Sequence, residues 1–169
     1  MKRIYLVRHA KSSWKHIGLS DHDRPLNERG ERDAPRMGRR LQKSGARPDL
    51  LLSSPARRAI STARIIAEEL GYPPERIVEE PMIYDGSARE IFELFKKLPA
   101  QVDSVMLFGH NLEITILAEY LTPNPIGNLP TCGVFCADFA VESWPKIAEN
   151  AGQLVFFDYP KNPAHPKEG

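Results

Sequence analysis

Short apolar runs of four or five residues alternate with longer amphipathic segments along most of this chain. The apolar runs are typical of buried strands, and the longer segments place apolar residues on one side at helical spacing. Strands are predicted at 4–7, 49–53, 104–108 and, more weakly, 76–80, and helices at 27–44, 56–70, 87–98 and 112–121. Because strands and helices alternate, we predict an α/β fold, a three-layer sandwich with a mostly parallel central sheet and helices on both faces.

The last part of the chain departs from this alternation. Residues 122–133 contain several prolines and glycines and are predicted to form a long loop. Two closing strands are predicted at 134–141 and 153–158, as antiparallel neighbours. The tail 160–169 is rich in proline and is expected to be loose. Because the chain has 169 residues and neither an internal repeat nor a linker, we expect one domain over 1–169.

Capping residues predict where the first two helices begin and end. Asn27 is a good N-cap for the first helix, and Ser44-Gly45 should end it. Pro35 falls inside this helix and is expected to bend or split it. Gly71 should stop the second helix.

The composition is that of an ordinary globular protein, with 41% hydrophobic and 27% charged residues. A formal net charge of +1 gives no sign of a nucleic acid or a membrane as partner. No apolar stretch is long enough for a signal peptide or a membrane span. Cys132 and Cys136 are expected to be free thiols on one strand face in a reducing cytoplasm, so we expect a cytoplasmic location. The oligomeric state stays open.

One segment is rich in basic residues. A solvated helix face is the favoured interpretation for such a cluster. Its members are Arg24, Arg29, Arg32, Arg36, Arg39, Arg40, Lys43 and Arg47.

Polar residues follow three of the predicted strands: Arg8-His9, Ser53-Ser54 and Gly109-His110. The carboxyl ends of parallel strands lie together, and ligands bind beyond them in open α/β sheets. His9 and His110 are therefore expected to be close, although they are far apart in the sequence. The helix after Ser54-Pro55 should add Arg57 and Arg58 from its first turn.

Two histidines, two or more arginines and a helix N-terminus describe an anion site. Arginine forms bidentate bonds to phosphoryl oxygens, and free N–H groups at a helix N-terminus bind the same anion. A neutral histidine can act as a nucleophile, and a second histidine can stabilise charge or move a proton. Phosphoryl transfer needs mainly positioning and charge neutralisation, which these groups supply without a cofactor or a metal.

A loop from Lys15 to Pro25 contains a second group of polar residues, His16, Asp21, His22 and Asp23. Such a cluster suggests a metal, but its spacing fits no helical or strand ligand pair. We therefore expect no metal site.

Three motifs resemble those of the histidine phosphatase superfamily, whose fold is phosphoglycerate mutase-like. Leu6-Val7-Arg8-His9-Ala10 resembles its Arg-His-Gly signature, Ser54–Ala63 its Ser-Pro-x-x-Arg-Ala-x-x-Thr motif, and Gly109-His110-Asn111 its third motif. The segments 23–30 and 129–134 are similar to those of the short SixA-type phosphohistidine phosphatases. The resemblance extends from Ile4 to about Asp158.

The resemblance implies a role for each matching residue. His9 is the expected nucleophile, and Arg8, Arg58 and His110 are the expected phosphate pocket. Arg58 matches the family position better than Arg57, because Ala59 and Thr62 follow it at the expected spacing. Ser12 and Asn111 are further candidates for substrate binding.

Two positions depart from the family pattern. Ala10 replaces the usual glycine, which is tolerable if the backbone there needs no positive φ. Lys11 stands where mutase-like members have glutamate, and the chain lacks the extra segments of a mutase. The resemblance therefore implies a metal-independent phosphatase with a phosphohistidine intermediate, acting on phosphohistidine in a protein. The alternatives are a phosphatase for small phosphate esters and a phosphate-binding module without turnover.

The proton donor for the leaving group is the least defined part of the site. Ester-cleaving relatives commonly use a glutamate after the third strand, and none falls clearly there in this chain. Asp85 is the nearest carboxylate and the tentative general acid. Asp85-Gly86 is also a common turn dipeptide, and the turn is the favoured interpretation.

Overall fold

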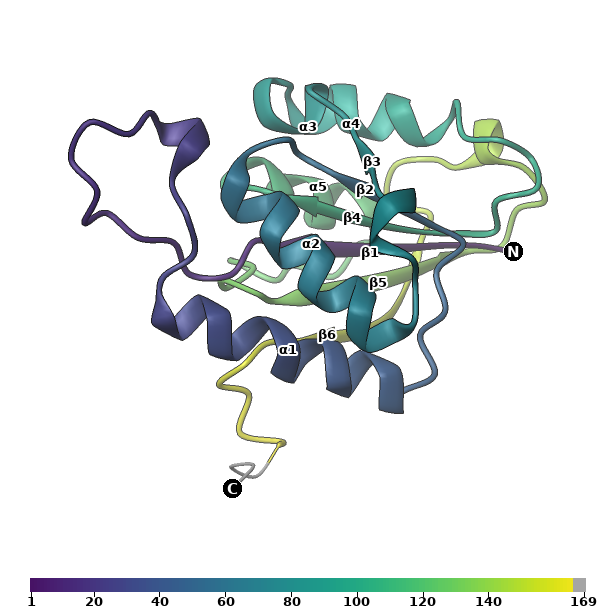
Figure 1. The fold of residues 1–169 in the computed structure, drawn as a ribbon. Helices are drawn as coiled ribbons and strands as arrows, with labels where there is room; N and C mark the ends of the chain where they lie inside the picture. The colour runs from purple at the N-terminus through teal and green to yellow at the C-terminus, as the bar shows by residue number, and fades with distance from the viewer. Residues whose placement is uncertain (166–169) are drawn as a thin grey trace.

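The computed structural model describes residues 1–165, which form one six-stranded sheet in the order β3-β2-β4-β1-β5-β6 (Figure 1). The strands are β1 (Lys2–Arg8), β2 (Leu50–Ser53), β3 (Val78–Glu79), β4 (Ser104–Gly109), β5 (Val134–Phe139) and β6 (Gln153–Asp158). β3, β2, β4 and β1 pair in parallel, whereas β5 is antiparallel to both β1 and β6. The predicted α/β fold with a mostly parallel sheet is confirmed.

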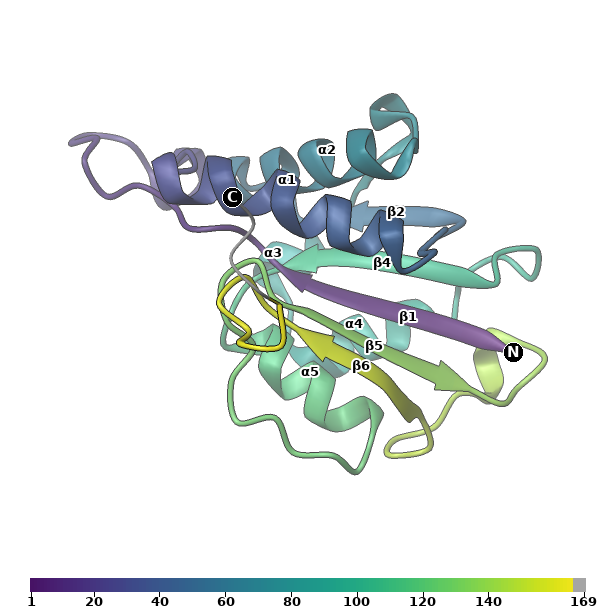
Figure 2. The same ribbon diagram turned by 90° about the horizontal axis from the view of Figure 1, so that it is seen from below.

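Helices cover both faces of the sheet (Figure 2). α1 (Glu28–Lys43) and α2 (Arg57–Leu70) lie side by side on one face. α3 (Met82–Asp85), α4 (Ala88–Phe95) and α5 (Glu113–Leu121) lie on the other face. The three layers of the predicted sandwich are thus present.

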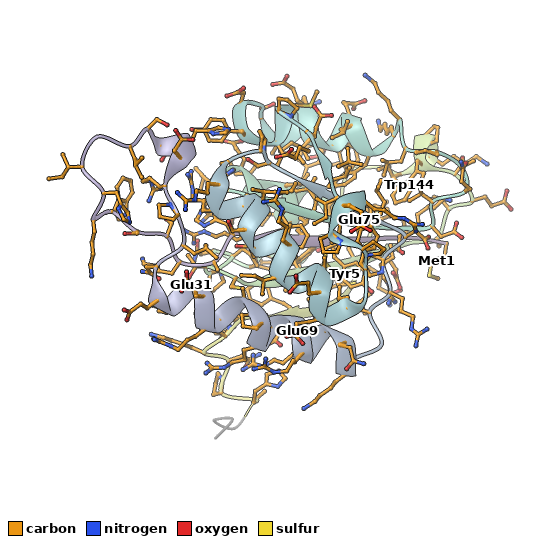
Figure 3. All side chains as sticks on the ribbon, in the orientation of Figure 1. Met1, Tyr5, Glu31, Glu69, Glu75 and Trp144 are labelled. Atoms are coloured by element: carbon orange, nitrogen blue, oxygen red, sulfur yellow. The ribbon has the colours of Figure 1, made fainter. Side chains whose placement is uncertain are left out.

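Strand β1 shows how the sequence builds these layers. Its side chains alternate between the faces of the sheet. Ile4 and Leu6 pack into the hydrophobic cluster that includes residues of α4 and α5. Tyr5 and Val7 pack into the cluster under α1 and α2, and Figure 3 labels Tyr5 in this interior. A strand buried on both faces explains why 4–7 reads as a continuous apolar run.

Helix α1 begins as predicted but is not split. The side chain of Asn27 accepts a hydrogen bond from the Gly30 N–H at 2.9 Å, as an N-cap does. Pro35 lies inside a continuous helix, which differs from the expected split. Ala34 and Met37 are buried on either side of it, and their packing outweighs the one backbone hydrogen bond that proline cannot donate.

Gly30 lets α1 approach the loop that leaves β1. A Cβ atom at this position would collide with the carbonyl oxygen of Lys11. The same carbonyl accepts a hydrogen bond from the Asn27 N–H at 2.9 Å. The first turn of α1 and the loop after β1 therefore hold each other in place.

Both cysteines are buried and neither forms a disulfide. Cys132 and Cys136 belong to the same hydrophobic cluster, in agreement with the prediction that they share a face. Burial raises the pKa of the Cys136 thiol to about 12.

The end of the chain is more ordered than expected up to residue 165. Arg40 of α1 donates hydrogen bonds to the carbonyl oxygens of Tyr159 and Pro160, both at 3.0 Å. His165 and Asn162 contact Asp158 at 3.0 and 2.9 Å. Residues 159–165 thus make contacts with α1 and with the end of β6. The rest of the predicted loose tail, 166–169, lies outside the described residues.

In the part of the chain that the structure describes, no helix is both long enough and apolar enough to cross a membrane.

Candidate active site

The site lies where parallel strands end. The register pairs Arg8 of β1 with Gly109 of β4, so His9 and His110 leave neighbouring strands at the same level. The backbone N–H of His9 donates to the carbonyl of Gly109 at 3.1 Å. The two imidazole rings lie 5.2 Å apart between centroids. The topology thus brings together the two histidines that are far apart in the sequence.

A cavity of about 420 Å³ opens over these strand ends. Four of its lining residues are cationic and one is a carboxylate, which makes it a site for an anion. The lining residues are Arg8, His9, Lys11, Ser12, Trp14, Asp21, Arg24, Arg58, His110, Asn111 and Thr131.

His9 is held as a neutral imidazole with one free ring nitrogen. It is 8% exposed, and its Nδ1 lies 2.7 Å from the carbonyl oxygen of Ala10. A carbonyl only accepts, so Nδ1 carries the proton and Nε2 has the lone pair. Burial lowers the pKa of His9 to about 4, and the charges of Arg58 and Arg8 act in the same direction. At neutral pH the ring is therefore uncharged and the lone pair of Nε2 is available.

The loop that carries His9 is fixed by helix α2. The Ala10 N–H donates to Thr62 Oγ1 at 3.0 Å, and the Thr62 hydroxyl donates to the Arg58 carbonyl at 2.8 Å. Among the described non-glycine residues, only Cys132 and Asn150 have a positive φ. Ala10 therefore needs no glycine-like backbone, and its departure from the family pattern carries no strain.

Three buried nitrogen atoms of the cavity residues have no hydrogen-bond partner among residues 1–165: Arg8 Nε, Arg58 Nε and His110 Nδ1. His110 Nε2 lies 2.8 Å from Ser54 Oγ, which also accepts the Ala56 N–H. A Ser54 hydroxyl that donates to Nε2 leaves the proton of His110 on Nδ1. Burial, with the neighbouring His9 and Arg58, lowers the pKa of His110 to about 3. Unpaired buried donors are costly, so an anion that accepts from all three would be bound strongly.

The two predicted arginines are placed differently from each other. Arg58 is buried in α2 and lines the cavity, whereas Arg57 is exposed and does not. Arg8 donates to the carbonyl of Leu129 at 3.1 Å, and burial lowers its pKa.

Asp21, which the sequence analysis considered only as a metal ligand, lines the cavity. Its carboxylate accepts from Arg58 Nη2 at 2.9 Å, from Tyr84 Oη at 2.7 Å and from Arg24 Nε at 3.2 Å. Burial acts to raise the pKa of Asp21, but the hydrogen bonds from Tyr84 and Arg58 outweigh it and lower the pKa to about 2. Asp21 is thus ionised at neutral pH and holds two arginines at the cavity. The local polar cluster did not reveal this role, because the Arg58 and Tyr84 partners of Asp21 are distant in the chain.

Ser12 and Asn111 line the cavity, and both are already engaged. Ser12 Oγ accepts from Arg24 Nη1 at 2.8 Å. The Asn111 amide donates to Asn128 at 2.7 Å, and its oxygen accepts from Thr115 at 2.6 Å. Both side chains therefore support the wall of the cavity.

Asp85 is not brought to the cavity. It is exposed at the end of α3 and is not among the lining residues. The expected loop is a one-turn helix here, and this turn directs Tyr84, rather than Asp85, to Asp21. The tentative assignment of Asp85 as general acid therefore lacks a geometric basis.

The polar loop before Pro25 forms no metal-binding cluster. Among residues 1–165 there is no group of three or more His, Cys, Asp or Glu side chains that could hold a metal ion. His22 packs edge-on against the Tyr84 ring at 5.1 Å and lies 3.6 Å from Asp23.

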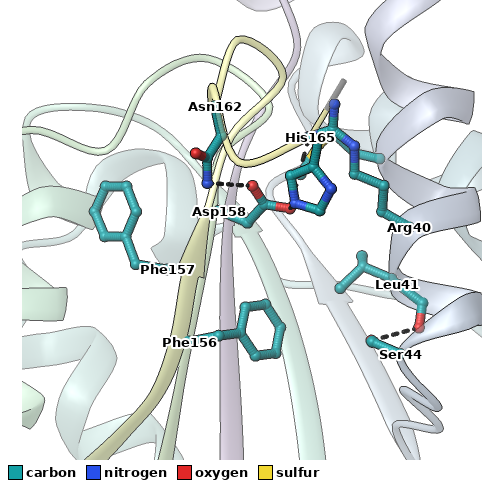
Figure 4. A pocket seen from close by; sticks show the side chains of 9 residues that line it. Arg40, Leu41, Ser44, Phe156, Phe157, Asp158, Asn162 and His165 are labelled. Atoms are coloured by element: carbon teal, nitrogen blue, oxygen red, sulfur yellow. Dashed lines mark hydrogen bonds and ion pairs between the residues drawn. The ribbon is translucent and has the colours of Figure 1, made fainter. Parts of the chain in front are cut away.

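A second cavity, of about 310 Å³, lies between α1 and β6 (Figure 4). Its walls are largely apolar side chains such as Met37, Leu41 and Phe156. Asp158 is paired with His165 at 3.0 Å, and Ser44 donates to the Leu41 carbonyl at 2.8 Å. Both Asp158 and Ser44 thus have a hydrogen-bond or ion-pair partner within this wall.

Comparison with known proteins shows the family and the fold of this chain. The model of the histidine phosphatase superfamily (branch 1) matches residues 4–81. An uncharacterised chloroplastic protein of Arabidopsis thaliana is 32% identical over 159 residues, which are 89% of this chain and 72% of the relative. A crystal structure from Agrobacterium tumefaciens that bears the name phosphohistidine phosphatase SixA is 28% identical, with a TM-score of 0.81 over 94% of this chain and 98% of the other. The protein histidine phosphatase SixA complexed with tungstate is 19% identical and shares the fold, with a TM-score of 0.80 over 94% and 97% of the two chains.

Proposed function

Because the chain belongs to the histidine phosphatase superfamily, as a SixA-type member, we propose that it is a phosphatase that works through a phosphohistidine on His9 and acts on phosphohistidine in a protein. The observation that carries the proposal is the arrangement around His9. A neutral imidazole with a free Nε2 lies beside three buried nitrogens that have no partner among the described residues. These donors match the oxygens of a phosphoryl group.

The first chemical step transfers the phosphoryl group to His9. The lone pair of Nε2 attacks phosphorus, and the bond from phosphorus to the leaving nitrogen breaks, with its electron pair going to the leaving imidazole. The phosphorylated ring of His9 carries a positive charge, which the Nδ1–H donation to the Ala10 carbonyl stabilises. Arg8, Arg58 and His110 neutralise the phosphoryl oxygens.

In the second step, water attacks phosphorus and the bond to Nε2 breaks. The electron pair returns to Nε2, and the proton of the water passes to the released phosphate. Both steps use only groups that the cavity supplies. We therefore expect full activity in excess EDTA.

The leaving group separates phosphohistidine from an ester. An alkoxide usually needs a proton from a general acid. Among the described residues, Asp21 is the only carboxylate that lines the cavity, and its pKa of about 2 leaves it without a proton at neutral pH. An imidazole can be protonated beforehand and then leaves without such help. The site is thus better suited to a phosphorus–nitrogen bond.

The test compares three substrates on the intact protein: a phosphohistidine peptide, phosphoramidate and an alkyl phosphate ester. We expect both phosphorus–nitrogen substrates to be hydrolysed much faster than the ester. Asp85→Asn is the control and should leave all three rates within about twofold of wild type, as expected for an exposed surface change. Faster hydrolysis of the alkyl ester than of either phosphorus–nitrogen compound would refute the substrate assignment.

A further inference from the structure

A loop at the mouth of the cavity exposes several large apolar side chains. We call residues 14–20 the rim loop. Trp14 begins it and Asp21 follows it, and both of these residues line the cavity. The loop projects beyond the carboxyl end of β1, at the left of Figure 1. Its two ends therefore lie at the rim of the site.

The rim loop exposes apolar side chains both at its start and along its length. The exposed fractions are 76% for Trp14, 102% for Ile17 and 41% for Leu19. Single exposed apolar residues are common on protein surfaces, but a group beside a site suggests an interaction surface. Three large apolar side chains in one short loop next to an anion cavity form such a group.

The base of the rim loop is firmly anchored. Arg24 stacks on the Trp14 ring, 3.5 Å from its centroid, and donates to Ser12 Oγ at 2.8 Å. The Ser13 N–H donates to the Pro25 carbonyl at 2.8 Å. Arg58 donates to the backbone carbonyl of Asp21 at 2.6 Å. The same arginines that line the cavity thus fix the position of the loop.

The length of the loop keeps its tip close to the cavity. Six residues separate Trp14 from Asp21, so about three lead outward and three return. At about 3.5 Å per residue, the tip lies within roughly 10 Å of the rim. A small phosphorylated compound held in the cavity would not cover Ile17, whereas a protein surface around a phosphorylated residue would.

The charges around the mouth of the cavity limit which partner surface would fit. Lys11 lines the cavity, Lys15 is an exposed residue of the rim loop itself, and Arg57 is exposed at the start of α2. The two carboxylates that follow the loop already have partners: Asp21 pairs with Arg58 and Arg24, and Asp23 lies 3.6 Å from His22. A complementary surface would therefore be apolar at the point of contact and acidic around it.

We propose that the rim loop is the docking surface for the substrate protein, whose phosphohistidine lies in an apolar surface edged by acidic residues. This inference rests on the proposed function and specifies its substrate further. Ile17 and Leu19 would contact the protein around the phosphorylated residue, while the cavity holds the phosphoryl group.

The test uses two phosphohistidine peptides, one with leucine and aspartate around the histidine and one with serine and glycine. Wild type should prefer the first by about tenfold in kcat/KM, the effect expected of a few buried apolar contacts. The double variant Ile17→Asp/Leu19→Asp should lose this preference through KM. Its turnover of phosphoramidate should stay at the wild-type rate. Val155→Asp is the matched control and should keep the preference, because Val155 on β6 is as exposed as Leu19, at 41%.

Two results would overturn the docking surface alone: equal rates on the two peptides in wild type, or an unchanged preference in the double variant. An equal loss on the peptides and on phosphoramidate would also overturn it, because the loop would then act on the cavity. If wild type hydrolyses phosphoramidate but neither peptide, the protein substrate of the proposed function fails as well. If it hydrolyses nothing, the chemistry on His9 fails.

Discussion

Strand β1 has a cation at each end, the buried Lys2 and the half-buried Arg8, and their hydrogen-bond donors are used very differently. Lys2 donates to the carbonyl oxygens of Ala100 and Val102 at 3.0 and 2.8 Å, and to Asp103 at 2.8 Å. An ammonium has three donors, so all of them are used. At the other end, among residues 1–165, the Arg8 side chain donates one hydrogen bond, from Nη1 to the Leu129 carbonyl. Its buried Nε has no partner among these residues. Figure 3 labels Met1 and Trp144 at the Lys2 end, opposite the rim loop.

The difference separates structure from function. A buried charge whose donors are all used needs no ligand, and removing it would leave its buried partners unpaired. A buried donor without a partner destabilises the fold, and it is retained where a ligand completes it. The presence of a cation alone would not distinguish the two ends of β1, whereas the unused buried donor of Arg8 does.

The largest expected effect is on kcat/KM, from a substitution of Arg58 beside the cavity. Arg58→Ala should lower kcat/KM by about 10²–10³-fold, because it removes one preorganised charge from the transferred phosphoryl group. Arg57→Ala is the matched control, since Arg57 is its exposed neighbour on the same helix turn, and it should cost less than about twofold. Steady-state kinetics with phosphoramidate measure both variants. Similar losses in the two variants would mean that Arg58 has no special place in the site.

At the other end of β1, where Lys2 lies, a substitution is expected to lower stability rather than activity. Lys2→Met should lower the free energy of unfolding by about 1–3 kcal/mol, because two carbonyl groups lose their donor. Its kcat should stay at the wild-type value. Urea unfolding and kinetics on the same samples measure this, with exposed Lys97→Met as the control. If Lys2→Met lost activity without losing stability, Lys2 would not have the purely structural role that distinguishes it from Arg8.

The smallest expected effect is that of pH on the turnover rate, which should change little between pH 7 and 5. Burial lowers the pKa of His9 from its usual 6.5 to about 4, so the reactive neutral form persists as the pH falls and is lost only near pH 4. At pH 5 about nine-tenths of His9 is neutral, against about 3% for an ordinary imidazole. Turnover of an aryl phosphate, corrected for substrate ionisation, should therefore change less than about twofold between pH 7 and 5. A decline centred near pH 6.5 would show that His9 is not buried as described.

The sheet and the histidine pair could be predicted because both depend on strand patterns. Apolar runs located β1 and β4, and their parallel pairing brings His9 and His110 to one edge whatever the loops do. Asp21 could not be found in this way. Its position depends on hydrogen bonds from Arg58 and Tyr84, which lie far along the chain.

Two further differences have local causes that a pattern does not reveal. The turn dipeptide Asp85-Gly86 suggested a loop, but the single turn of α3 brings Tyr84 to the site and leaves Asp85 in solvent. Pro35 suggested a split helix, but burial of Ala34 and Met37 keeps α1 continuous. In both cases tertiary packing decided between alternatives that the local sequence left open.

The central claim is that Nε2 of His9 takes the phosphoryl group. Wild type mixed with a phosphohistidine peptide, quenched in alkali and mapped by mass spectrometry tests it most directly. Because Nδ1 donates to the Ala10 carbonyl, we expect a base-stable, acid-labile phosphoryl group on Nε2 of His9. The same label should be absent in His9→Ala, which should also show no turnover while its circular dichroism is unchanged. A label on His110, or appreciable turnover in His9→Ala, would contradict the account.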